Sequence, residues 1–269
     1  MKLASSNSVL LKVEGLEKRF GGIIALADYD VEIRPGELVG LIGPNGAGKT
    51  TVFNLLSGVL KPNQGRIVFN GQDITRLRPD QNAALGIART FQNIRIFKEL
   101  SVIDNVKVAF HIRMGRGFWK TLMHTSDYRY SENEIEQKSH EILELFDLEA
   151  RKDQPAKNLS YGIQRRVEIA RAMATMPKLL LLDEPSAGLN TGETDELVKT
   201  LRKIHDTYGL TIFIVEHDMK LIMTICQRIQ VIDRGRMLST GTPEDVRHDQ
   251  RVIEAYLGKS GHGKQYAQG

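Results

Sequence analysis

A run of residues near the N-terminus has the types and spacing of a phosphate-binding loop. The loop comprises Gly43, Pro44, Asn45, Gly46, Ala47, Gly48, Lys49 and Thr50, with a second threonine, Thr51, directly after it. Glycines let backbone N–H groups converge on phosphate oxygens, and the positive end of the following helix points at them. A lysine at this spacing supplies charge for the β- and γ-phosphates, and the first threonine hydroxyl can coordinate Mg²⁺. The pattern predicts a nucleoside triphosphate site, with a chance glycine-rich turn as the alternative.

Two adjacent carboxylates follow an apolar run in the second half of the chain. The run is 179–182, and Asp183 and Glu184 come directly after it. Open α/β sheets present their ligand-binding residues at the carboxyl ends of buried strands. Asp183 therefore suits a contact to Mg²⁺ through water, and Glu184 can polarise a water for in-line attack on the γ-phosphate. The alternative is that the pair only caps the next helix.

Apolar patterning predicts the elements that must position these groups. Short apolar or alternating runs predict strands at 9–13, 23–33, 38–42, 66–69, 87–91, 179–182 and 211–215. Helical spacing of apolar residues predicts helices at 51–60, 102–110, 132–146, 191–208 and 220–227. The expected fold class is α/β: a P-loop NTPase core with a parallel sheet, an N-terminal antiparallel β lobe around the turn at Gly21 and Gly22, and an inserted α-helical subdomain at about 93–159. One nucleotide-binding domain at 9–258 and a flexible polar tail at 259–269 complete the expected organisation.

Composition excludes several classes without naming a partner. The chain has 269 residues, 41% of them hydrophobic, which is enough for a large buried core and excludes a disordered or fibrous protein. The net charge of +4 is only mildly basic. Cys226 is the single cysteine, so an internal disulfide is impossible. Residues 1–8 lack the apolar core of a signal peptide, and no stretch approaches the roughly 18 apolar residues of a membrane span. We expect a soluble chain that docks at a membrane through other subunits.

The sequence Leu-Ser-Tyr-Gly-Ile-Gln at 159–164, together with the loop and the Asp-Glu strand, resembles the ABC ATPase family from residue 11 to about residue 258. The resemblance implies that the cofactors are ATP and Mg²⁺. It also implies that Ser160 and the Gly162 backbone, at a helix N-terminus, bind the γ-phosphate of ATP held by the opposite subunit, so that hydrolysis needs a dimer. The commonest family pattern has Gly in place of Tyr161 and Gln in place of Ile163.

Further positions acquire roles through the same resemblance. Phe20 resembles the aromatic residue that stacks on adenine, although an isolated aromatic is more often part of a core. Gln92 resembles the glutamine that reaches Mg²⁺ and the attacking water, and His217 resembles the histidine that bonds the γ-phosphate. Without the family match, the glutamine would be interpreted as a surface residue and the histidine as structural. Residues 186–190 resemble the loop that crosses the dimer interface, with Asn190 where many relatives have Asp.

A narrower resemblance concerns the transported substrate. The segments 89–92, 186–190, 216–220 and 252–258 resemble the larger ATPase of branched-chain amino-acid importers. This implies as partners a second ABC ATPase subunit, either a related separate chain or a second copy when isolated, two transmembrane permease subunits and, indirectly, an extracytoplasmic substrate-binding protein. The implied location is the cytoplasmic face of the inner membrane.

The segment 111–131 combines basic and aromatic residues, and it resembles an insertion of that importer subfamily. Such a mixture is compatible with nucleic acid, but a surface insertion near the permease is favoured because no other feature supports base stacking. Three alternatives stay open: a soluble ABC-type ATPase acting on nucleic acid or ribosomes, an importer ATPase for another amino acid, an amide or urea, and a non-catalytic ATP-binding regulator. The first of these typically has coiled coils or a second ATPase domain, which this sequence lacks.

Overall fold

The computed structural model describes residues 9–113 and 126–257. The predicted tail at 259–269 lies outside this description, as does most of the predicted insertion at 111–131. The chain divides into two compact units, which are described separately: unit 1 combines Met1–Asn82 with Thr211–Gly269, and unit 2 is Ala83–Leu210. Within the described ranges, no helix combines the length and apolar character that crossing a bilayer requires.

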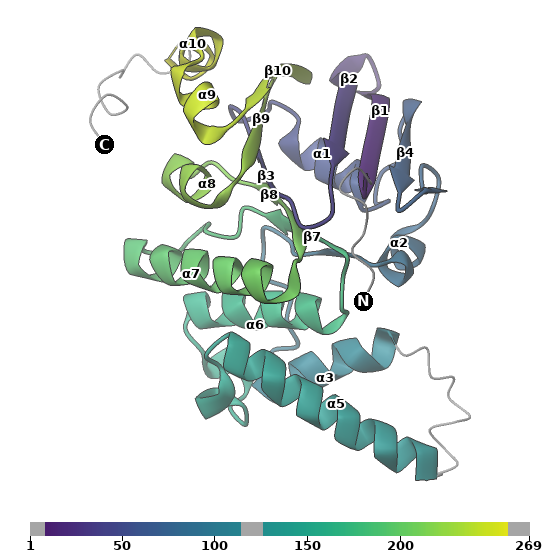
Figure 1. Cartoon of the computed structure of the whole chain (residues 1–269), viewed down its shortest axis with the longest axis vertical. Helices are drawn as coiled ribbons and strands as arrows, with labels where there is room; N and C mark the ends of the chain where they lie inside the picture. Colours follow the sequence, from purple (N-terminus) through teal and green to yellow (C-terminus); the bar gives the residue numbers. More distant parts are fainter. Residues whose placement is uncertain (1–8, 114–125, 258–269) are drawn as a thin grey trace. The chain divides into compact units, whose positions relative to one another are not determined.

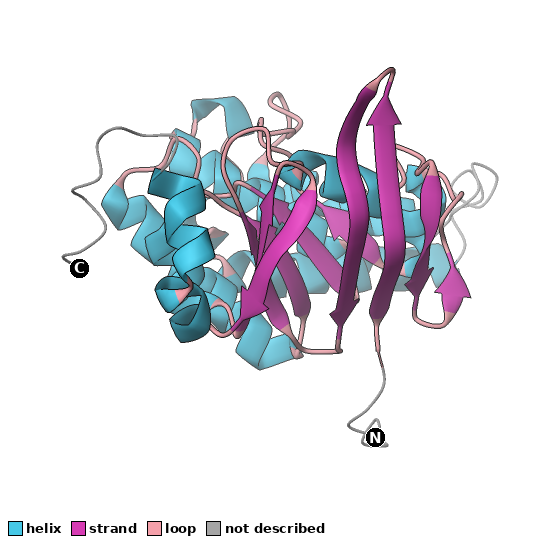
Figure 2. Ribbon diagram, turned by 90° about the horizontal axis from the view of Figure 1, so that it is seen from above, coloured by secondary structure: helices cyan, strands magenta, loops and turns pink. Residues whose placement is uncertain are grey.

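Unit 1 contains the predicted antiparallel β lobe. Its strands, in the order β2-β1-β4-β5, are β1 Leu11–Phe20, β2 Ile23–Ile33, β4 Gln64–Phe69 and β5 Gln72–Asp73. The long β1–β2 hairpin is drawn among the magenta strands in Figure 2. The prediction of a strand at 9–13 was wrong in extent, because β1 continues to Phe20. Charged residues at 14 and 17–19 interrupt the alternation there, and Gly15, with a φ of 55°, lies within a shift of the pairing register.

Unit 1 also contains a buried parallel segment. Strand β3 (Leu38–Ile42) is parallel to β8 (Thr211–Val215) on one side and to β9 (Arg228–Asp233) on the other. Strand β10 (Arg236–Gly241) pairs antiparallel with β9. Every residue of β3 and β8 is buried, as strands covered on both faces must be. The helices of unit 1 and its border are α1 Lys49–Leu56, α2 Pro79–Leu85, α8 Met219–Ile225, α9 Pro243–His248 and α10 Gln250–Leu257.

Unit 2 is mainly helical around one parallel strand pair. Strand β6 (Ile87–Arg89) is parallel to β7 (Leu179–Asp183). Two short 3-10 turns lie at Glu149–Arg151 and Ala156–Asn158, and the helices are α3 Val102–Arg113, α5 Ser126–Leu145, α6 Tyr161–Ala174 and α7 Thr191–Tyr208. Helix α3 packs against α5 and α6 (Figure 1). The apolar side chains of Val106, on α3, and Phe146, directly after α5, are fully buried. The polar residues of unit 2 that form the candidate site lie on β6 and β7, in the segments that follow these strands, or on α6.

Most predicted elements exist, with shifted ends. Strands 23–33, 38–42 and 211–215 and helix 191–208 have the predicted bounds. The strand predicted at 87–91 ends at Arg89, although the Thr90 N–H still donates to Leu181 O at 3.0 Å. The helix predicted at 51–60 begins and ends earlier, because α1 starts inside the phosphate loop at Lys49.

Candidate functional site

The phosphate loop of unit 1 is shaped by glycines whose surroundings leave no room for a side chain. A Cβ on Gly43, which has a φ of 156°, would lie 2.1 Å from the Ile232 carbonyl oxygen. A Cβ on Gly48, with a φ of 109°, would lie 2.8 Å from the Ala25 carbonyl oxygen. Both distances are shorter than any normal contact, so the loop can follow this path only with glycine at these two positions.

Lys49 and the start of α1 supply the positive groups of this loop. The Lys49 side chain is buried, and its ammonium donates to the carbonyl oxygens of Gly43 at 2.6 Å and Pro44 at 3.2 Å. The ammonium is thereby held across the loop. Gly48 is the N-cap of α1 and offers no side-chain acceptor to the first turn. Thr50 is exposed. Loop, ammonium and helix start together form an arrangement that can bind an anion such as a phosphate group.

Unit 1 also positions the predicted adenine and γ-phosphate residues. Phe20 ends β1 with 47% of its surface exposed, and the Lys18 ammonium lies 5.3 Å from its ring centre. The alternative that Phe20 belongs to the core is wrong. His217 is the second residue after β8, and its side chain is 58% exposed. The buried Glu216 carboxylate accepts hydrogen bonds from the backbone N–H groups of His217 at 3.1 Å and Asp218 at 3.4 Å, which fixes the turn that carries the histidine.

In unit 2, Asp183 is the last residue of β7 and lies in a buried ion pair. Its carboxylate accepts a hydrogen bond from the Arg89 guanidinium at 2.8 Å, and the two side chains are only 5% and 7% exposed. The Asp183 N–H also lies 3.4 Å from the Thr90 hydroxyl. Removing a carboxylate this far from water is tolerable because a guanidinium compensates its charge.

Glu184 and Gln92 are in direct contact. The Gln92 side-chain amide donates to the Glu184 carboxylate at 3.0 Å. Glu184 has a φ of 45°, in the left-handed region that residues other than glycine rarely adopt. Such backbone strain is concentrated at functional sites. The alternative that Asp183 and Glu184 cap the next helix is wrong, because Asn190 caps α7.

Ser160 and Gly162 begin helix α6. Ser160 is the N-cap, it is exposed, and its hydroxyl makes no capping bond to the helix. Gly162 is buried, and a Cβ there would lie 2.6 Å from a carboxylate oxygen of Glu193. The Tyr161 ring lies over Gly188, where a Cβ would be 3.0 Å from it. The Tyr161 ring is therefore accommodated because Gly188 has no side chain.

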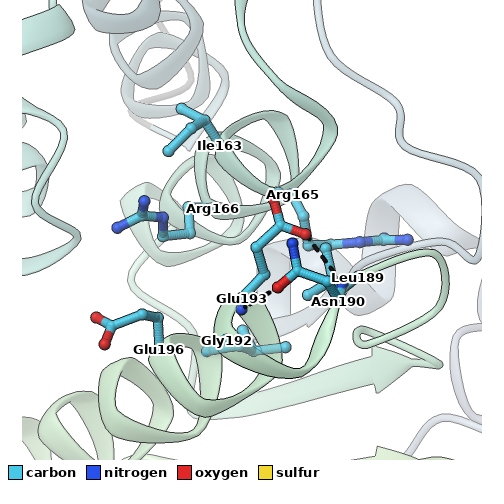
Figure 3. A pocket seen from close by; sticks show the side chains of 10 residues that line it. Ile163, Arg165, Arg166, Leu189, Asn190, Gly192, Glu193 and Glu196 are labelled. Atoms are coloured by element: carbon cyan, nitrogen blue, oxygen red, sulfur yellow. Dashed lines mark hydrogen bonds between the residues drawn. The ribbon is translucent and has the colours of Figure 1, made fainter.

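Helix α7 begins with a capping box of its own. The Asn190 side chain accepts from the Glu193 N–H, and the Glu193 carboxylate accepts from the Asn190 N–H, each at 3.0 Å (Figure 3). Asparagine and aspartate cap helices about equally well, which explains why asparagine is accepted here. A cavity of about 190 Å³ lies between α6 and α7 and is smaller than the roughly 300–1,000 Å³ of typical ligand pockets.

Several residues that build these sites are missed by the sequence interpretation. Arg89, Arg165, Glu168 and Glu193 are all held in specific contacts within unit 2. Arg89 lies in the segment 89–92, whose resemblance to importer ATPases was the one feature of the sequence that pointed to it. Charged residues on helices are expected at the surface, so the burial of Arg165 and Glu168 has no signature in one sequence.

The predicted Mg²⁺ ligands have suitable chemistry. Thr50, Gln92 and Asp183 offer hydroxyl, amide and carboxylate oxygens, which are the donors that Mg²⁺ prefers. No cluster of three or more His, Cys, Asp or Glu side chains that could hold a metal occurs among the residues that the structure describes. Proteins usually bind Mg²⁺ through one or two carboxylates together with substrate phosphates, so one buried aspartate suits a cation that arrives with a nucleotide.

Comparisons with known proteins agree on one family. The family described as ABC transporter matches residues 26–187, and that described as branched-chain amino acid ATP-binding cassette transporter matches residues 236–262. The chain is 45% identical over 251 residues to the high-affinity branched-chain amino acid transport ATP-binding protein LivG of Escherichia coli (strain K12), covering 93% of this chain and 98% of that protein. It is 43% identical, with the same coverage, to the high-affinity branched-chain amino acid transport ATP-binding protein BraF of Pseudomonas aeruginosa.

Solved structures give the same answer. The ADP conformation of MJ1267, an ATP-binding cassette of an ABC transporter, has a TM-score of 0.82 at 31% identity and covers 94% of this chain and 100% of its own. The α/β P-loop NTPase fold and the resemblance to ATPases of branched-chain amino-acid importers, both predicted from the sequence, are thereby confirmed. The chain belongs to the ABC transporter family, in which it is an ATP-binding cassette that hydrolyses ATP.

Proposed function

We propose that this cassette hydrolyses Mg²⁺-bound ATP to drive the import of branched-chain amino acids. The observation that supports the hydrolytic centre best is the contact between Gln92 and the strained Glu184, next to the buried Asp183. A carboxylate held by an amide, at the end of a buried strand, is suited to orient a water and take its proton.

The unit 1 residues bind the nucleotide. Phe20 stacks on adenine, and the backbone from Gly43 to Thr51 surrounds the phosphates. Lys49 balances the charge of the β- and γ-phosphates, and the Thr50 hydroxyl contributes one oxygen to Mg²⁺. When bound, Mg²⁺ neutralises charge that develops on the phosphate oxygens during transfer.

The unit 2 residues act on the attacking water. Asp183, through water, and the Gln92 side-chain oxygen would hold Mg²⁺, and Glu184 would take a proton from the attacking water. The water oxygen forms a bond to the γ-phosphorus while the bond from that phosphorus to the β–γ bridging oxygen breaks, which yields ADP and inorganic phosphate. His217 bonds the γ-phosphate and positions the water.

A second cassette completes each nucleotide site. We infer that Ser160 and the Gly162 backbone bind the γ-phosphate of ATP held by the opposite subunit, through the free N-cap hydroxyl and the positive end of α6. Support comes from a solved dimer of the bacterial ABC transporter cassette MJ0796, which has a TM-score of 0.73 at 25% identity to this chain. The partner in the importer is a related chain, and an isolated cassette can pair with a second copy.

Relatives support the transported substrate and the location. LivG and BraF are named as branched-chain amino acid transport proteins, and the second matching family model carries the same description. We infer that two permease subunits hold this cassette at the cytoplasmic face of the inner membrane, and that closure of the ATPase dimer changes access to leucine, isoleucine or valine delivered by a binding protein.

The test of the hydrolytic centre compares two variants. In Glu184→Gln, the general base is lost while the nucleotide contacts remain, so ATP should still bind and a closed dimer should accumulate. In Lys49→Ala, the phosphate charge is uncompensated, so most nucleotide affinity should be lost as well. Measurements of ATP binding, dimer formation and phosphate release separate the two. Unchanged phosphate release in Glu184→Gln would exclude Glu184 as the base.

The shared-site arrangement and the substrate have their own tests. Mixing a Ser160→Arg chain with a Lys49→Ala chain should restore one working site per mixed dimer, because only one pocket then combines an intact loop with an intact Ser160. No restored turnover, or two restored sites, would contradict sites shared between subunits.

Cells lacking this chain should lose high-affinity uptake of labelled leucine, isoleucine and valine. Retained uptake of these, with loss of urea or amide uptake, would assign a different substrate.

A further inference from the structure

Helix α6 carries a buried ion pair that the proposed mechanism does not use. Arg165 and Glu168 lie three residues apart, their side chains are 0% and 2% exposed, and the guanidinium donates to the carboxylate at 2.7 Å. Ion pairs of this spacing normally lie on the solvent-exposed face of a helix, where they cost little and contribute little. This one is enclosed, so its remaining hydrogen-bonding groups need partners inside unit 2.

Most of those partners belong to the segment that contains Gln92; the exception is the Tyr161 hydroxyl of the same helix, which lies 3.4 Å from Arg165 Nη2. Arg165 donates from Nη1 to the Phe91 carbonyl oxygen at 2.8 Å and from Nη2 to the Gln92 carbonyl oxygen at 2.7 Å. The Glu168 carboxylate accepts from the Arg95 N–H at 3.0 Å. One ion pair therefore holds three backbone groups within residues 91–95. We refer to Arg165 and Glu168 as the clamp.

The desolvation cost of burying Arg165 and Glu168 indicates that the clamp contributes more to the position of the backbone than to stability. Both charges lose their hydration, and the buried Arg165 Nε has no hydrogen-bond partner within the described part of the chain. Buried ion pairs of this kind are often matched in stability by apolar side chains of similar volume, whereas they specify one geometry strictly. The geometry specified here is that of Gln92, whose amide donates to Glu184.

We propose that Arg165 and Glu168 are positioning residues for hydrolysis, which fix the backbone of Gln92 and thereby the contact between Gln92 and Glu184. The proposal deepens the proposed function and rests on it for the roles of Gln92 and Glu184. Because Ser160 is the N-cap of α6, the clamp also connects the Gln92 segment to the helix whose N-cap is the proposed γ-phosphate contact of the opposite site.

The test uses the full chain and replaces both clamp residues together. A single replacement would leave a buried charge without its partner and could prevent folding. In Arg165→Met with Glu168→Gln, the volume is retained and the neutral amide can still accept from the Arg95 N–H. We expect kcat to fall about tenfold or more, since misplacement of a catalytic group by about 1 Å can cost this much, while KM for ATP stays within about twofold. Arg166→Met is the control on the same helix. The Arg166 guanidinium donates to the Phe146 carbonyl oxygen at 3.5 Å, outside the Gln92 segment, so this variant should retain kcat.

A double-mutant cycle identifies the route of the effect. If the clamp acts through Gln92, then replacing it in a Gln92→Ala background should change kcat by less than about twofold. An unchanged kcat in the clamp variant, or an equal fall in both backgrounds, would overturn the proposal.

Hydrogen exchange of the peptide covering residues 91–95 gives a readout that does not need ATP hydrolysis. Its exchange should rise at least about tenfold in the clamp variant and stay unchanged in Arg166→Met. Unchanged exchange in the clamp variant overturns the clamp itself. Full phosphate release by Glu184→Gln would instead overturn the proposed function, so the two failures are distinguishable.

Discussion

The phosphate loop of unit 1 and the Gln92–Glu184 centre of unit 2 hold their chemical groups by different means. In the loop, position is set by backbone: Gly43 and Gly48 pass so close to neighbouring carbonyl oxygens that any side chain would collide. Even the Lys49 ammonium is held by loop carbonyls. The loop is therefore sensitive to added atoms.

In the centre, position is set by buried side-chain charges. Arg89 compensates Asp183, and Arg165 with Glu168 holds the segment that carries Gln92. Each pair is enclosed, so the loss of one member leaves a charge that water cannot reach. The centre is therefore sensitive to removed charges. A rigid backbone loop suits the binding of phosphate groups, whereas the proposed roles in orienting a water and Mg²⁺ require side chains that are positioned individually.

The largest expected effect is that of Gly43→Ala. Its Cβ would lie 2.1 Å from the Ile232 carbonyl oxygen, so the loop must move, and we expect ATP binding and phosphate release to fall to background. Gly71→Ala is the matched control, because Gly71 has a φ of 80° with no atom within 4 Å of the added Cβ. The control should lose about 1 kcal/mol of unfolding free energy and retain ATP binding. Normal ATP affinity in Gly43→Ala would refute backbone positioning of the loop.

Arg89→Met tests whether a buried ion pair stabilises the region around Asp183. It leaves the Asp183 carboxylate buried without its recorded ion-pair partner, so we expect a loss of about 3–5 kcal/mol in the free energy of unfolding. The control is Arg78→Met, which breaks the exposed pair with Asp80 and should lower the free energy of unfolding far less than Arg89→Met, because water screens both charges. Urea unfolding measures both. Equal losses in the two variants would mean that burial of the ion pair has no energetic consequence.

Asn190 allows a milder test at the start of α7. Asn190→Ala removes the side-chain acceptor of the capping box and should cost about 1 kcal/mol, while Asn190→Asp should change stability by only a few tenths. Thermal unfolding of the three proteins measures the difference. A large loss in the aspartate variant would show that the side chain has a role other than capping.

The smallest effect concerns acid titration at the surface of the β lobe. Hydrogen bonds from Thr75, and then from Arg66, lower the pKa of Asp73 from 3.8 to about 2. Because the folded pKa is depressed, this carboxylate contributes stability above about pH 3.8, and the contribution is lost as pH falls towards 2. Carboxyl chemical shifts followed by NMR during an acid titration measure the pKa directly. Thr75→Val should return it towards 3.8, and an unmoved value would assign the shift to another group.

The sequence alone determined the parts of this protein that depend on local pattern. Uncharged runs such as 38–42 and 211–215 must be buried on both faces, and glycines at the spacing of residues 43–50 have few uses besides a phosphate loop. For the same reason, the bounds of several strands and of α7 matched the prediction, and the family was evident from the segment at 159–164. Elements without such patterns were not predicted: β10 is polar and half-exposed, and α9 is short.

Tertiary structure decided which polar residues contact the proposed catalytic groups. The ion pair of Arg89 with Asp183 joins residues 94 positions apart, and the bonds of Arg165 to the Gln92 segment span more than 70. Sequence spacing carries no record of such contacts, since a charged side chain has the same pattern whether it is solvated or enclosed. Only folding removes water from these charges, and burial is what makes their contacts with the proposed hydrolytic centre specific.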